Sequence, residues 1–177
     1  MGFLAEWRAS RERRQLAERY LRALLAPVDA ADVDWLAAAC GDRAVAQREL
    51  GYARRALGLI VAERDALDDR TASDVSHALS AMIASAGGDS ADSAREWGLR
   101  YRAYTAALAV RGQADSPAVR FARVLLQGAG VADPSPAALG AATEFVRQHR
   151  SNANESLRSV FGAASLPEDV RPSALRP

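Results

Sequence analysis

The chain has 177 residues and a formal net charge of +1 at pH 7, because 23 arginines, with no lysine, nearly balance 22 acidic residues. Its only cysteine, Cys40, excludes an internal disulfide bond and fits a reducing cytoplasm. No apolar run approaches the roughly 18 residues that a membrane-spanning helix needs. We therefore expect a cytoplasmic protein that makes no membrane contact.

The first predicted element is an amphipathic helix over residues 3–25. Apolar side chains repeat at helical spacing along one face, at Leu16, Ala17, Tyr20, Leu21 and Leu24. A narrow arc on the opposite side carries Arg8, Arg11, Arg19 and Arg22. Pro27 ends this helix, since proline removes a backbone donor and clashes with the preceding turn.

Helical patterns continue along the chain, and alternating strand patterns are almost absent. A short helix is expected to start at a cap formed by Asp29 or Asp32 and to end at Cys40. The remaining predicted helices cover residues 44–66, 71–85 and 91–112, one that opens at Ser116-Pro117, one from Pro134-Ser135-Pro136 to about residue 150, and a shorter one over 153–162.

These patterns predict an all-α fold of about seven helices in one or two bundled lobes. Gly87-Gly88 is the clearest break between helical segments. The predicted lobes are therefore residues 1–86 and residues 89–162. Residues 163–177 include several prolines and are predicted to form a disordered tail.

Charge is segregated along the sequence in a way that the net value hides. Residues 1–26 carry six arginines against three glutamates, and residues 95–158 carry nine arginines against five acidic residues. Between them, residues 27–94 carry twelve acidic residues against six arginines. Clustered charges of this kind steer ligands even when the total charge is close to zero.

Residues that could carry catalysis are few and scattered. The two histidines, His77 and His149, lack the further donors of a metal site, and we interpret both as polar surface or boundary positions. The acidic turn at residues 65–69 lacks the ligand pattern of a calcium loop. Cys40 has no evident base, and no phosphate-binding glycine loop is present. The sequence predicts a binding protein that is not an enzyme and uses no metal or cofactor.

The arginine surplus, with serine and asparagine nearby, indicates contact with a nucleic-acid backbone. No base-reading motif is evident, so binding is expected to be independent of sequence. Trp97, Tyr101 and Tyr104 share one helical face with Leu108, and we expect them to pack in the core rather than on bases. The candidate contact residues are Arg11, Arg22, Arg95, Arg102, Arg120, Arg123, Arg147 and Arg150.

Short motifs spread over residues 3–162 follow the order seen in one known family. They are Phe3-Leu4-x-x-Trp7, Arg22-Ala23-Leu24-Leu25-Ala26-Pro27, Arg48-Glu49-Leu50-x-Tyr52, Ala56-Leu57-x-Leu59, Ser93-Ala94-Arg95-Glu96-Trp97, Arg120-Phe121-Ala122-Arg123-Val124-Leu125-Leu126 and Leu157-Arg158-x-x-Phe161-Gly162. In this pattern the chain resembles the small all-helical subunit of type I-E CRISPR surveillance complexes (Cascade).

The resemblance implies a two-lobed helical protein that serves antiviral defence without being a nuclease. It implies assembly as a head-to-tail dimer beside other protein subunits, where basic residues hold single-stranded DNA or a guide–target hybrid. The arginines that the resemblance assigns to strand contact are Arg95, Arg102, Arg120, Arg123, Arg147 and Arg150. The sequence leaves DNA and RNA equally open as the bound strand.

A protein of another class fits the sequence as the alternative. A helical scaffold or adaptor that binds only other proteins would use the acidic stretch, residues 27–94, as its docking surface. Its arginine-rich helices would then be solvated faces, in agreement with the low net charge. A helical metalloenzyme is disfavoured because paired Glu-x-x-His motifs are missing from the sequence.

Overall fold

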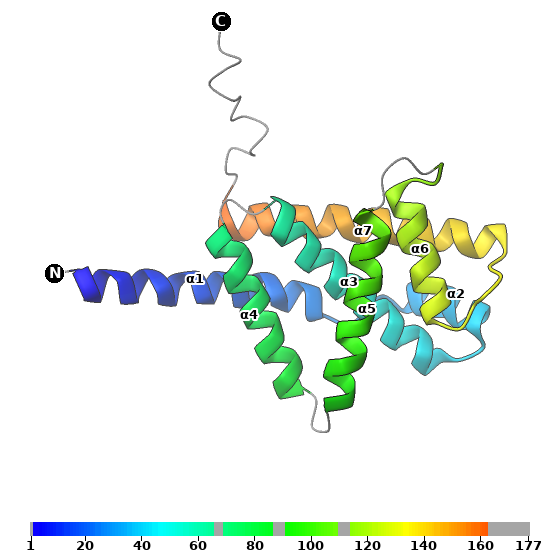
Figure 1. The fold of residues 1–177 in the computed structure, drawn as a ribbon, viewed down its shortest axis with the longest axis horizontal. Coiled ribbons are helices and arrows are strands. Elements are labelled where there is room, and N and C mark those ends of the chain that lie inside the picture. Colours follow the sequence, from blue (N-terminus) through cyan, green and yellow to red (C-terminus); the bar gives the residue numbers. More distant parts are fainter. Residues whose placement is uncertain (1, 66–68, 87–90, 110–113, 163–177) are drawn as a thin grey trace, which may run out of the picture.

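The computed structural model describes residues 2–65, 69–86, 91–109 and 114–162, which form seven α-helices and no strand (Figure 1). This confirms the all-α class. The predicted break at Gly87-Gly88 and the predicted tail over residues 163–177 lie outside the described residues. The helices are α1 (Gly2–Leu25), α2 (Ala30–Cys40), α3 (Arg43–Asp65), α4 (Asp69–Ala86), α5 (Ala91–Ala109), α6 (Pro117–Gly128) and α7 (Pro136–Phe161).

Local side chains explain where several helices begin. Asp29, not Asp32, caps α2, and its carboxylate accepts the backbone N–H of Ala31 at 3.0 Å. Ser116 and Ser135 cap α6 and α7, each followed by a proline in the first turn, as the sequence predicted. Gly41 ends α2 with a φ of 79°, a left-handed conformation that favours glycine.

The predicted end of a helix near residue 150 is wrong, because α7 runs without a break to Phe161. Residues 151–154 include serine and two asparagines, which are weak helix formers. In the folded chain Ala153 and Leu157 are buried in the smaller of two apolar clusters, where α7 packs on α1 and α3. Burial of this apolar face outweighs the weak helix propensity of residues 151–154, so the helix continues to Phe161.

Helix α3 is the centre of the fold, because it packs against each of the other six helices. In Figure 1, α1 and α7 run along the long axis of the molecule, and α4, α5 and α6 run across it. Two clusters of buried apolar side chains form along α3. One joins α3 to α2, α5, α6 and α7, and the other joins α3 to α1, α4 and α7.

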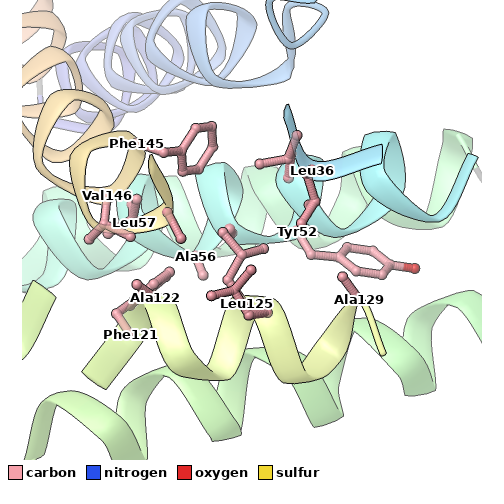
Figure 2. Close-up of a cluster of buried hydrophobic side chains, with 14 of the residues drawn as sticks. Leu36, Tyr52, Ala56, Leu57, Phe121, Ala122, Leu125, Ala129, Phe145 and Val146 are labelled. Carbon is pink, nitrogen blue, oxygen red and sulfur yellow. The ribbon is translucent and has the colours of Figure 1, made fainter. Parts of the chain in front are cut away.

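The larger cluster is drawn in Figure 2, where Phe121 and Leu125 of α6 face Ala56 and Leu57 of α3. Tyr104 of α5 stacks on Phe121 at 4.2 Å between ring centroids and is fully buried, as the sequence predicted. Both clusters contain side chains from before residue 86 and from after residue 89. The packing therefore joins the two predicted lobes through α3 and α7.

Helices α1 and α3 are in close contact at Gly58. The Tyr20 hydroxyl donates a hydrogen bond to the Gly58 carbonyl oxygen at 2.8 Å. A Cβ atom added at Gly58 would lie 2.2 Å from Cδ1 of Leu24, a side chain that is itself buried. A residue without a side chain is therefore needed at this crossing.

Gly58→Ala is expected to lower the free energy of unfolding by about 1–2 kcal/mol, because overpacking outweighs the gain in helix propensity. Gly51→Ala is the control, since it lies in the same helix and its added Cβ would meet nothing within 4 Å. We expect that change to raise the free energy of unfolding by up to about 1 kcal/mol. Urea unfolding followed by circular dichroism measures both, and equal effects would contradict the crowding at Gly58.

A buried ion pair links α3, α5 and α6. The Arg100 guanidinium donates to both carboxylate oxygens of Glu49, at 2.7 and 3.0 Å, and to the Gly128 carbonyl oxygen at 3.0 Å. Glu49 is fully buried, whereas 28% of the Arg100 side chain is exposed. The hydrogen bonds to Glu49 raise the pKa of Arg100, although burial opposes them. Arg48 approaches the same carboxylate at 3.7 Å.

Arg100→Met is expected to lower the free energy of unfolding by about 3 kcal/mol, because it leaves the Glu49 carboxylate buried without its main partner. Adding Glu49→Leu removes that charge, so the double variant should recover most of the loss. Denaturant unfolding of wild type, both single variants and the double variant measures the coupling. Additive losses would show that the pair contributes no coupling energy.

Candidate nucleic-acid interface

On α5, Arg95 and Arg102 lie seven residues apart on the same side of the helix, opposite the buried Tyr104. Both side chains are exposed, and neither makes an ion pair with another described residue. Leu99, which is 52% exposed, lies on the same outer side. This part of α5 presents positive charge to solvent.

On α6, the structure gives the two predicted arginines different surroundings. Arg120 donates from Nε to the Ala107 carbonyl oxygen at 2.8 Å and from Nη1 to the Asp115 carbonyl oxygen, so it ties the end of α5 to the start of α6. Arg123 is exposed, and its Nε lies 3.2 Å from the Asp115 carboxylate. Arg120 therefore has a structural role that sequence reasoning did not anticipate.

On α7, Arg147 and Arg150 are both exposed. Arg147 lies 3.7 Å from the exposed carboxylate of Glu144, one turn away. Arg150 has no acidic partner among the described residues, and the same holds for the exposed Arg158. Helices α6 and α7 pack together, so Arg120 and Arg123 of α6 and Arg147 and Arg150 of α7 lie on neighbouring helices.

On α1, Arg11 and Arg22 are exposed as predicted, and the guanidinium of Arg11 lies 5.6 Å from the ring centroid of Trp7. Three more exposed arginines on this helix, absent from the predicted contact set, are Arg8, Arg14 and Arg19. None of the five pairs with an acidic side chain in the described part of the chain. Helical spacing in the sequence already placed Arg8 and Arg19 on the polar side of this helix. It did not place Arg14 there, because Arg14 lies nearer the edge of the buried face.

The predicted arginines lie on four helices with different packing neighbours. Helix α1 packs on α3, α4 and α7, whereas α5 packs on α3 and α6. The arginines of α1 and those of α5 therefore belong to helices that share only α3 among these neighbours.

Of the twelve acidic residues at positions 27–94, the seven whose side chains the structure describes all have partners within the fold. Asp29 and Asp42 accept backbone N–H groups at the starts of α2 and α3. Other carboxylates contact side chains elsewhere in the chain, in the pairs Asp32–His149, Asp34–Arg43, Glu49–Arg100, Glu63–Tyr101 and Asp74–Arg13. Several exposed arginines in the described part of the chain, by contrast, form no ion pair there.

His149 is not the polar surface residue that the sequence predicted. Its ring packs on Phe145 at 4.2 Å between centroids, and its Nε2 lies 3.4 Å from the carboxylate of Asp32 on α2. Only 15% of the side chain is exposed. Burial lowers the pKa of His149, and the nearby Arg54 acts in the same direction, although Asp32 opposes both.

The lowered pKa of His149 predicts a loss of stability in mild acid. Below its unfolded-state pKa of about 6.5, the unfolded chain binds a proton that the folded chain resists, so the free energy of unfolding falls as pH decreases. Urea unfolding at pH 7.5 and at pH 5.5 should show this fall in the wild type and a smaller one in His149→Gln. His77→Gln, at an exposed histidine, should keep the wild-type pH dependence. An identical fall in His149→Gln would contradict this assignment.

Within the described residues, no three His, Cys, Asp or Glu side chains gather in a way that could hold a metal ion. In the same part of the chain, no helix is both long and apolar enough to cross a membrane. Comparison of this chain with protein families, with curated proteins and with solved structures found no match.

Proposed function

We propose that this protein is a non-catalytic subunit of a nucleoprotein complex that holds a nucleic-acid strand through arginine–phosphate contacts. The observation that supports this proposal is a contrast between two sets of described side chains. The carboxylates of residues 27–94 contact partners within the fold, whereas several exposed arginines form no ion pair. Arginine offers a planar fork of donors that fits phosphate oxygens. Because such contacts go to the backbone, binding would depend on salt and not on base sequence.

The resemblance of the sequence motifs to the Cascade small subunit gives this function a specific form. In that form the protein would sit beside other subunits, in one or two copies, and hold single-stranded DNA or a guide–target hybrid. The all-α fold agrees with the resemblance. Of the arginines it assigns, Arg95, Arg102 and Arg150 are exposed and form no ion pair within the described chain, so they are the best placed to reach a phosphate. Arg102 also donates from Nε to the Gly98 carbonyl oxygen of its own helix at 3.2 Å, which leaves its other N–H groups for a ligand.

The test is a titration of a labelled single strand and of its duplex at several salt concentrations. For a single strand, the slope of log K against log salt should be about −0.7 for each phosphate contact. Arg95→Gln, Arg102→Gln and Arg150→Gln should each reduce the size of the slope by about 0.7. Arg64→Gln is the matched control, because Arg64 is exposed on α3 within the acidic stretch of the sequence.

Flat and weak binding by the wild type at low salt would overturn this proposal. That outcome would favour the adaptor that binds only proteins. Equal effects of Arg64→Gln and the other three substitutions would show that net charge, rather than the predicted contact residues, governs binding.

A further inference from the structure

Helix α1 carries a row of side chains that the rest of the described chain leaves uncovered. Trp7, Arg11, Arg14, Glu18 and Arg22 follow one another at spacings of four, three, four and four residues, which places them along one side of an α-helix. All five are exposed. We call this row the α1 stripe. The side of α1 that adjoins the stripe at Arg14 packs into the smaller cluster through Ala17, Tyr20, Leu21 and Leu24.

The N-terminal part of α1 extends beyond the other helices (Figure 1). The helix enters the packed body of the molecule further along, where Tyr20 and Leu24 meet α3 at Gly58. At about 1.5 Å per residue, the α1 stripe is about 22 Å long from Trp7 to Arg22. A ligand could lie along it without displacing another helix.

Trp7 is a large apolar side chain of the stripe that is not buried in the core of this chain. It is 54% exposed, and Leu99 on α5 is the only other large apolar side chain exposed to this degree among the described residues. The guanidinium of Arg11 lies over its ring, 5.6 Å from the centroid. An exposed aromatic ring beside arginines is the arrangement that proteins use to stack on a base while holding its phosphates.

A lipid surface would need a different pattern. Helices that lie in a membrane interface bury a broad apolar face beneath their basic side chains. Among the described side chains at residues 7–15 of α1, Trp7 is the only large apolar one that is exposed. One tryptophan among several arginines fits a nucleic-acid strand better than a bilayer.

We propose that the α1 stripe is a binding site for single-stranded nucleic acid, in which Trp7 stacks on a base and Arg11, Arg14 and Arg22 contact phosphates. This inference rests on the proposed function and names the part of the surface that performs it. It adds base stacking to the backbone contacts. The site should therefore prefer an unpaired strand, whose bases are free to stack, over a duplex.

The test compares two strands of about 16 nucleotides, the upper end of known single-strand site sizes. One is oligothymidine and the other is its abasic counterpart, which keeps the phosphates and lacks the bases. Trp7→Ala should weaken binding to oligothymidine roughly tenfold and leave binding to the abasic strand within about twofold of wild type. Gln47→Ala truncates an exposed side chain of α3 that belongs to no proposed contact set and should change neither affinity.

Glu18 provides a second test, because it places a negative charge inside the stripe. Glu18→Gln should strengthen binding of oligothymidine roughly threefold at low salt, where the repulsion is least screened. Glu12→Gln makes the same change of charge on the same helix but off the stripe, and it should have a smaller effect. Both glutamates are exposed, so neither substitution should disturb packing.

Two results would overturn the inference while leaving the proposed function intact. One is wild-type binding of oligothymidine that Trp7→Ala does not change. The other is an equal loss of affinity for the oligothymidine and the abasic strand. If the wild type binds neither strand but binds vesicles containing phosphatidylserine, both the inference and the proposed function are wrong, and α1 contacts lipid.

Discussion

The fold depends on a fully buried carboxylate, that of Glu49, and on the guanidinium that neutralises it. Arg100 reaches Glu49 from α5 and also binds the last turn of α6 at Gly128, so one cation fixes three helices relative to each other. A Cβ atom at Gly128 would come within 2.7 Å of the Glu49 carboxylate, which explains the glycine there. A buried charge tolerates few alternative arrangements, because moving either partner leaves the other unpaired in an apolar surrounding.

The ion pair lies where apolar packing alone would allow the helices to slide. Alanine is abundant in this chain, and its side chain is too short to interlock with a neighbouring helix. Ala46, Ala53 and Ala56 of α3 therefore allow close contact but do little to fix the position of one helix along another. Beside the ion pair, Tyr52 donates to Glu96 at 3.2 Å and Tyr101 donates to Glu63 at 2.8 Å. These polar contacts specify how α5 lies on α3. Burial raises the pKa of both tyrosines, and their carboxylate partners raise it further. The outer side of α5, with its arginines, is thereby held toward solvent.

Within the described part of the chain, the acidic side chains of the central stretch are used inside the fold. Carboxylates of the central stretch cap helices or meet partners from distant parts of the chain, such as Arg13, Arg100 and His149. Among the exposed arginines of α1, α5 and α7, Arg11, Arg95 and Arg150 form no ion pair with another described residue. The field that a ligand meets is therefore set by which charges remain free after folding rather than by the sum over the sequence.

The sequence by itself determined the helical class and most helix positions, because apolar periodicity, proline and the capping serines act over a few residues. It also identified Tyr104 as a core residue and Arg95 and Arg102 as outward-facing. Only the tertiary structure decided that α7 continues past residue 150, that Arg120 binds the end of α5, and that His149 is buried against Asp32. Each of these depends on contacts between residues that are distant in sequence. The spacing of residues along the sequence shows on which side of a helix each residue lies. Which other helix contacts that side is decided by the packing of the whole chain.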